Sequence, residues 1–423
     1  MYKHILTQHT LLDVAVLLLY LYGILLLARK FREIHPRYLR FFLLIGVEHL
    51  FFTFSYYYYS LGNVADSVGY YRTVYFLTDS WKDVFGQGTL FIYFTLYPLI
   101  KVLHLTYLSC FLVYSFIGLL GFYYLLKMAI HINNNHWSNW YYILLLPNLH
   151  FWTNALGKDS LIFYGIAGIT YCLYFKKKWI SFLFPVLVVG FVRIHVLFFI
   201  LIALAINYFI LSKKFRTGQR ILMAAVFILS IYLLFPFFAQ RVGLSEENSL
   251  EERIEQMQNV NQAGTTSVNM ADSNLLVRWN SYFFRPFFYD AHNMLAMVAS
   301  MENVAWIIMF IFILLYTKRN WFYLKQNPFF IFCLLAIFIV SFPSVLILTN
   351  LGIALRQKMM VFPFVFVFLI ALNKYYQLEK KEKVFRYLLF LLIFPYVFIR
   401  CRRTCQGDHR YTEVFKERTT GYF

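Results

Sequence analysis

Ten charged or titratable residues stand at the ends of apolar runs, where few polar neighbours surround them. The arginines and lysines among them suit a phosphate or diphosphate, since arginine offers a planar fork and lysine a point charge. The carboxylates and the imidazole could take a proton from a hydroxyl. The set comprises Asp66, Lys158, Asp159, Arg193, His195, Arg285, Asp290, Glu302, Arg356 and Lys358. It predicts a site for a phosphorylated substrate with a base beside it.

The stretch 147–160 holds the densest part of this set. It separates the apolar run 141–146 from the apolar run 161–175, and it ends in Lys158, Asp159 and Ser160. Charges at the mouth of a membrane helix are costly to bury and usually have a partner or a function. Arg193 and His195 likewise lie between two apolar runs, with no polar loop to keep them in water. We therefore expect Arg193, Arg356 and Lys158 to gather around one cavity.

Composition decides which kind of fold must position these residues. The chain is 61% hydrophobic and only 14% charged, whereas soluble domains are about 45–50% apolar and about 25% charged. Several apolar runs approach the roughly 20 residues that cross a bilayer. The sequence predicts an all-α polytopic integral membrane protein with about 11–12 transmembrane helices and a re-entrant or interfacial helix in the first outer loop. Residues 1–400 would form a single transmembrane domain, and residues 401–423 a polar C-terminal tail.

The apolar runs set the expected element boundaries. Segment 89–103, broken by Pro98 and Lys101, is expected to be the re-entrant or interfacial helix, and 349–358 a tight polar turn. The outer loops are placed at about 60–88 and 240–302, the second with an amphipathic helix at 246–262. The predicted spans are 11–28, 41–58, 107–126, 141–152, 160–175, 179–192, 196–211, 221–238, 304–316, 329–348, 359–372 and a marginal 387–399.

The net charge of +19 could indicate a nucleic-acid partner. The positive residues fall between apolar runs, however, as membrane orientation requires, and form no patch with interleaved aromatics. If the loop after residues 11–28 is cytoplasmic, that side holds 21 Lys and Arg, and the four short loops opposite hold six. The unexplained charges then share the outer face. Arg400, Arg402 and Arg403 fit this orientation only if segment 387–399 is interfacial; otherwise the tail lies outside, and both readings stay open.

Four short blocks, in this order, resemble bacterial proteins of surface-polysaccharide synthesis. They are Ala65-Asp-Ser-Val-Gly-Tyr-Tyr71; Phe151-Trp to Gly157-Lys-Asp-Ser160 with Val192-Arg-Ile-His195; Phe284-Arg-Pro-Phe-Phe-Tyr-Asp290 with Ala299-Ser-Met-Glu302; and Asn350-Leu-Gly to Arg356-Gln-Lys358 before Pro363. The combination is similar to oligosaccharide repeat-unit polymerases (O-antigen polymerase-like) and to polyprenyl-dependent membrane glycosyltransferases of the GT-C-like class. It spans roughly residues 60–365. Asp66 departs from the pattern because it lacks the adjacent second acid of many such transferases.

The resemblance implies transfer or polymerisation of polyprenyl-pyrophosphate-linked oligosaccharide at the outer face of the bacterial inner (cytoplasmic) membrane. It implies Asp66, Asp290 or His195 as the base, and substrate binding by Lys158, Asp159, Arg193, Arg285, Glu302, Arg356 and Lys358. The implied partners are a polyprenyl-linked glycan, the lipid bilayer and a chain-length regulator, with no nucleic acid. No cofactor is expected; a divalent cation is compatible with the chemistry but is not indicated by the sequence.

Two other classes of function remain open. A transporter or flippase of lipid-linked glycan should contain paired repeats with broken helices near the midplane, and no such internal symmetry is visible in the sequence. A non-catalytic membrane scaffold would not need an outer-side arginine such as Arg193. Polymerisation and single-unit transfer cannot be distinguished from the sequence.

Overall fold

The computed structural model describes residues 2–211, 273–291 and 294–377, with a few isolated positions between 218 and 270. These residues form helices and no β-strand, as predicted for an all-α fold. Six of the helices are long and apolar enough to cross a membrane, so the chain is a multi-pass membrane protein. They are α2 (Leu11–Arg32), α3 (Pro36–Gly62), α6 (Tyr107–Ile132), α14 (Met294–Leu324), α15 (Pro328–Leu346) and α16 (Leu351–Gln377).

Local signals explain where these long helices begin and end. At the start of α2 the backbone N–H of Thr10 donates to Asp13, as in a capping box. Three cations, Arg29, Lys30 and Arg32, occupy its last turn, where they complement the helix dipole. Helix α3 begins at Pro36, whose missing N–H costs nothing in the first turn. The predicted segments 11–28, 41–58 and 107–126 are therefore helical, with a few more residues at their ends.

Segment 141–152 is not the continuous helix that its apolar residues predict. A 3₁₀ helix, η4 (Asn139–Leu145), is followed by the short α7 (Pro147–Thr153). Pro147 explains the break, because it lacks an N–H and pushes the preceding residue out of the α region. Leu146 accordingly has φ −67° and ψ 120°. The prediction of a transmembrane helix here is wrong, and α7 is a short element within the protein.

Segment 349–358 is not the tight polar turn that was predicted, because the chain is helical from Leu351 onward. The side-chain oxygen of Asn350 accepts from the backbone N–H of Gly352 at 2.9 Å and of Ile353 at 3.2 Å, which caps a helix. Helix α16 therefore starts at Leu351, eight residues before the predicted span at Met359. Arg356 and Lys358 are helical residues, which fixes the directions of their side chains.

The remaining described elements are shorter. They are α1 (Tyr2–Leu6), α4 (Asp66–Arg72), η1 (Thr73–Leu77), η2 (Lys82–Val84), α5 (Thr89–Tyr97), η3 (Pro98–Val102), α8 (Lys158–Tyr174), α9 (Trp179–Val192), α10 (Ile194–Ala205), η5 (Ile206–Leu211), α13 (Leu275–Phe284) and η6 (Phe288–Asp290). Segment 89–103 is helical as predicted. Apart from a few isolated positions, the predicted elements at 221–238 and 246–262 lie outside the described residues, as do segment 387–399 and the tail 401–423.

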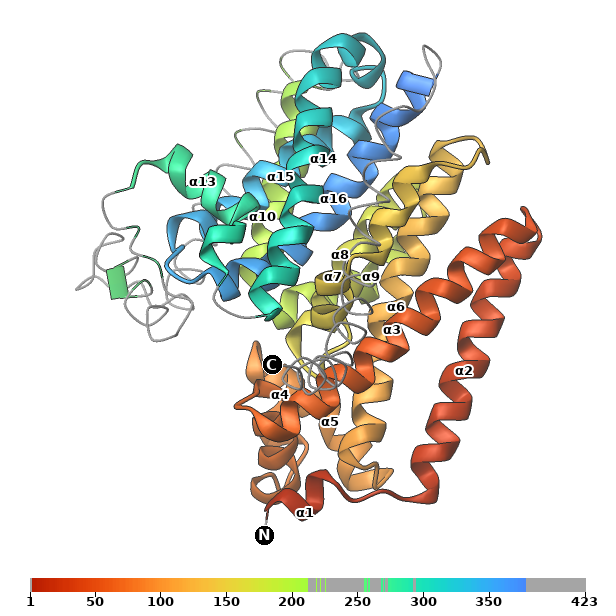
Figure 1. Cartoon of the computed structure of the whole chain (residues 1–423), viewed down its shortest axis with the longest axis vertical. Helices are drawn as coiled ribbons and strands as arrows, with labels where there is room; N and C mark the ends of the chain where they lie inside the picture. The colour runs from red at the N-terminus through yellow and green to blue at the C-terminus, as the bar shows by residue number, and fades with distance from the viewer. Residues whose placement is uncertain are drawn as a thin grey trace, which may run out of the picture.

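Helix α8 is the central element. Fourteen of its residues are buried, and it packs against α6, α9 and α16. Figure 1 shows α2, α3 and α6 on one side and α14, α15 and α16 on the other, with α4 and α5 at one end. The N-terminus of α8 is thus the point where both groups of helices can bring side chains together.

Candidate functional site

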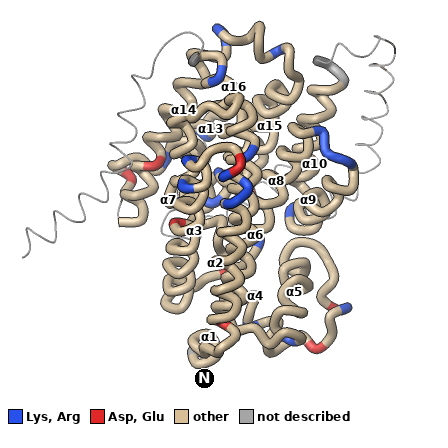
Figure 2. Tube along the Cα trace, turned by 90° about the vertical axis from the view of Figure 1, so that its right-hand side faces the viewer, with Lys and Arg blue, Asp and Glu red and all other residues tan. Residues whose placement is uncertain are grey.

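Asp159 is the centre of a cluster of charged side chains at the start of α8. Its carboxylate is 2% exposed. Arg193 donates from Nη2 to Asp159 Oδ1 at 3.2 Å, and Arg356 donates from Nε to Asp159 Oδ2. Figure 2 shows charges of both signs close together between the labels of α7 and α8. Two arginines from distant parts of the chain therefore share one buried carboxylate.

The backbone before α8 holds Asp159 in place. Gly157, the N-cap residue, has φ +150°, a backbone conformation that residues other than glycine rarely adopt. A Cβ there would also lie 3.0 Å from the ring of Tyr70. The acidic side chain follows in the first turn, where the positive end of the helix dipole stabilises it.

Arg193 occupies a break between two apolar helices. Its φ of −146° and ψ of 80° end α9 at Val192, and α10 resumes at Ile194. Such a break is tolerated in a membrane protein where the freed backbone lines a cavity or finds a partner. Here the carbonyl of Phe191 accepts from the N–H of Gly88 at 2.7 Å. The break joins α9 to the first long loop and turns Arg193 toward Asp159.

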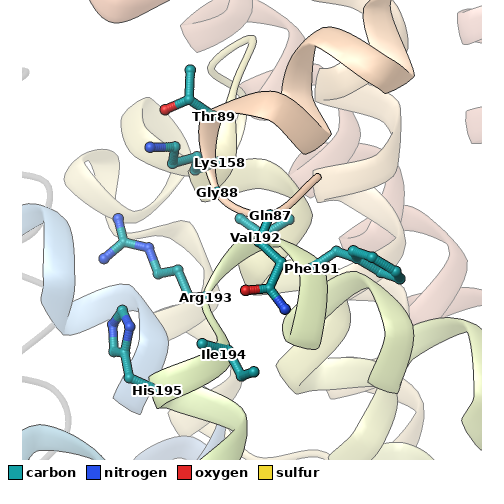
Figure 3. Close-up of a pocket in the computed structure, with 9 residues that line it drawn as sticks. All are labelled: Gln87, Gly88, Thr89, Lys158, Phe191, Val192, Arg193, Ile194 and His195. Carbon is teal, nitrogen blue, oxygen red and sulfur yellow. The ribbon is translucent and has the colours of Figure 1, made fainter. Parts of the chain in front are cut away.

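A cavity of about 460 Å³ lies beside this break. It is lined by Gln87, Gly88 and Thr89 at the start of α5, by Lys158 of α8, and by the residues 191–195. Figure 3 shows Lys158, Arg193 and His195 extending to the same side of the broken helix. Within the described residues, Lys158 has no ion pair, and the Nε–H of Arg193 is buried without a hydrogen-bond partner. The cavity is therefore lined by cationic groups whose donors are not all used.

Arg356 extends the cluster to the first loop and to α7. Its Nη1 donates to Asp66 Oδ2 at 3.0 Å, and Asp66 is 56% exposed. Its guanidinium lies 5.5 Å from the ring centroid of Trp152, a cation–π distance. The cluster thus contains three cations, Lys158, Arg193 and Arg356, against the two carboxylates of Asp66 and Asp159.

The other predicted residues form a second group. Arg285 donates to Asp290 from Nη2 at 2.6 Å and from Nε at 3.0 Å, a bidentate pair. These hydrogen bonds hold the pKa of Asp290 below its usual range, with the N–H of Phe287 as a further donor at 2.8 Å. Asp290 therefore lies in its own ion pair, and no described contact joins it to Asp159.

Lys358 and Glu302 belong to this second group. Lys358, 2% exposed, donates to Asn303 Oδ1 at 2.6 Å and to the carbonyl of Arg285 at 3.3 Å. Glu302 accepts from the N–H of Asn148, and both charged residues line one small void of about 10 Å³. Residues two apart on a helix point to opposite sides, so α16 directs Arg356 into one group and Lys358 into the other.

The ten predicted residues therefore sort into two sets. The first, which we call the Asp159 cluster, comprises Asp66, Lys158, Asp159, Arg193, His195 and Arg356; the second comprises Arg285, Asp290, Glu302 and Lys358. The sequence does not predict that these are separate. Among the residues that the structure describes, no group of three or more His, Cys, Asp or Glu side chains is placed to hold a metal ion.

Two features near the cluster were not predicted. An aromatic and apolar pocket of about 540 Å³ lies between α3, α7, α14 and α16, with Tyr59, Phe151 and Trp152 in its wall. The second feature is a contact between the buried His150 of α7 and the buried His49 of α3, with the part-buried Glu48 next to His150. A single histidine within the stretch 147–160 does not reveal its partner on another helix.

No family model matches this sequence, and neither a curated protein nor a solved structure matches it. The length and hydropathy of six helices still define its class. The chain is a helical, multi-pass membrane protein.

Proposed function

We propose that the Asp159 cluster binds the diphosphate of a polyprenyl-linked saccharide and that the protein transfers the saccharide to a hydroxyl acceptor. The observation that carries the proposal is the shared carboxylate: Arg193 and Arg356 both bind Asp159, and Arg193 lines a cavity together with Lys158 and His195. Buried charges in a membrane domain are rare and usually serve a substrate path or an ion.

The charge balance supports an anionic ligand. Three cations face two carboxylates, and Asp66 is largely exposed, so an entering diphosphate would meet a net positive site. Arginine forks can bind phosphate oxygens bidentately. The N-terminus of α5, whose N-cap Gly88 supplies no side-chain acceptor, adds unpaired backbone N–H groups at the same cavity. Donors fixed in advance stabilise charge that develops on a leaving group.

The proposed step is a single displacement at the anomeric carbon of the donor. The acceptor hydroxyl oxygen forms a bond to that carbon, and the bond from the carbon to the phosphate oxygen breaks. The diphosphate leaves with the bonding electrons, held by Arg193 and Arg356. The hydroxyl proton passes to Asp66, the exposed carboxylate of the cluster, or to His195 at the cavity wall.

A binding measurement tests this proposal directly. Purified protein in nanodiscs should bind farnesyl diphosphate more tightly than farnesyl monophosphate, and farnesol least, by microscale thermophoresis. Arg193→Ala and Arg356→Ala should each weaken diphosphate binding at least tenfold, since a charge-assisted hydrogen bond contributes about 1.5–3 kcal/mol. Arg40→Ala, which changes an exposed arginine outside the cluster, serves as the control.

Equal binding of farnesol and the diphosphate would refute the phosphate site. Diphosphate binding without any saccharide transfer from a lipid-linked donor would favour transport of the lipid-linked glycan instead. Binding of neither compound would favour a scaffold without a ligand site.

A further inference from the structure

A buried group outside the Asp159 cluster carries an inference that does not depend on the proposed function. His49 of α3 and His150 of α7 are both fully buried, and their Nδ1 atoms lie 2.9 Å apart. His49 Nε2 lies 3.0 Å from the carbonyl of Ser115 in α6. His150 Nε2 lies 2.7 Å from the carbonyl of Leu144. The four ring nitrogens of the pair therefore take part in three short polar contacts.

These three contacts need three protons. A carbonyl oxygen can only accept, so both Nε2 atoms must carry a hydrogen. The Nδ1–Nδ1 contact needs a third hydrogen, because two bare nitrogens at 2.9 Å would repel each other. Two neutral imidazoles carry only two N–H hydrogens between them. Any neutral arrangement leaves a ring nitrogen facing a carbonyl or another lone pair, at the full cost of a buried unsatisfied group.

We propose that His49 and His150 bind one additional proton between their Nδ1 atoms and form a buried pair with a single positive charge. Burial alone opposes a charged imidazole, so the charge needs compensation. Glu48 supplies it, with Oε2 3.9 Å from His150 Nε2 and a side chain 14% exposed. Glu302 of α14 accepts from the N–H of Asn148, two residues before His150 on α7.

The aromatic surroundings also fit a cation. The ring of Phe122 stacks on His150 with centroids 4.3 Å apart and planes within 4°. Phe52 covers it from farther away, with centroids 6.2 Å apart. The face of an aromatic ring attracts a cation, and more so where water is excluded. Hydroxyls of Thr53, Tyr20 and Ser115 bond to one another around His49 but add no charge.

The proton-binding pair joins α7 to α3 and α6. Helix α6 approaches α7 closely at Gly118, where a Cβ would lie 2.0 Å from the carbonyl of Thr153 and 3.4 Å from His49 Nε2. Two residues after His150 on α7, the ring of Trp152 lies 5.5 Å from the guanidinium of Arg356. The pair is therefore a positioning element for the wall of the Asp159 cluster, with a proton as its ligand.

Nitrogen NMR of protein labelled with ¹⁵N-histidine in lipid at pH 7.5 tests this assignment without any variant. We expect one scalar coupling between two Nδ1 atoms across a shared proton, with the Nε2 of both rings protonated. In the described residues, no other two histidines are hydrogen-bonded to each other, so the coupling identifies the pair. No such coupling, or one ring with a bare Nε2, would overturn the proposal.

A thermal comparison tests the charge separately. Glu48→Gln keeps the side-chain shape but removes the compensating charge, so its Tm in detergent should fall by several degrees. Glu33→Gln, which changes an exposed glutamate between α2 and α3, should leave Tm unchanged. An unchanged Tm for Glu48→Gln would show that the pair carries no charge and would overturn the assignment.

Discussion

Asp159 accepts a hydrogen bond from Arg356, a residue 197 positions later in the chain. The two side chains meet because α8 and α16 pack against each other in the centre of the molecule. A buried carboxylate and a guanidinium at this site must be placed together, since leaving either charge alone is strongly unfavourable. The contact therefore couples the fold of the helices to the geometry of the site.

Asp159→Asn should destabilise the protein strongly. The change leaves Arg193 and Arg356 without their shared carboxylate, and removing one partner of a buried ion pair costs about 3–5 kcal/mol. We expect a lower Tm in detergent and faster proteolysis between α8 and α9. Asp79→Asn, at an exposed position, is the matched control. A Tm for Asp159→Asn equal to that of the control would contradict the ion-pair assignment.

Gly118→Ala should loosen the contact between α6 and α7. The added Cβ would overlap the backbone carbonyl of Thr153, which cannot move without displacing α7. Overpacking of this kind typically costs about 1–3 kcal/mol. Gly69→Ala, where a Cβ meets nothing within 4 Å, should leave Tm unchanged or raise it. Equal stability of the two variants would mean that α7 does not pack closely on α6.

The ion pair of Asp290 and Arg285 should make local stability depend on pH. Because the pKa of Asp290 is lower in the folded protein than the usual value near 3.9, its contribution is present above that value. It is lost as pH falls through the folded pKa. Hydrogen exchange in residues 285–291 should be faster in Asp290→Asn than in wild type at pH 6, after correction for intrinsic exchange rates. The difference should shrink toward pH 3, and a constant difference would argue against the pair.

Labelling of single cysteines should establish the orientation. Cys110, Cys172 and Cys333 are buried and can stay in place. Cys401 and Cys405 would first be replaced by serine. A membrane-impermeant maleimide should then reach Lys82→Cys on intact cells, but Lys177→Cys only after permeabilisation. Both side chains are exposed. The reverse pattern would place the Asp159 cluster on the cytoplasmic side.

The sequence predicts the helices where apolar runs are bounded by charge, as at Leu11–Arg32 and Tyr107–Ile132. The predicted helix boundaries are wrong where a single residue, and not the hydropathy of the run, determines the local backbone. Pro147 divides the apolar run 141–152, and Asn350 starts a helix ahead of Arg356 and Lys358, whose charges had suggested a turn. The candidate residues stand out as isolated charges, but their partners depend on helix packing. His49 and His150, on separate helices, therefore could not be paired from the sequence.

The length distribution of surface glycan tests the central claim most directly. In cells where the variant is the only copy, Arg193→Ala and Arg356→Ala should each abolish long-chain glycan while the protein accumulates normally. Arg→Lys at either position should impair it substantially, because lysine keeps the charge but loses the planar fork. Arg40→Ala should give the wild-type distribution. Wild-type chain lengths from both cluster variants, at normal protein levels, would contradict a diphosphate site that serves glycan polymerisation.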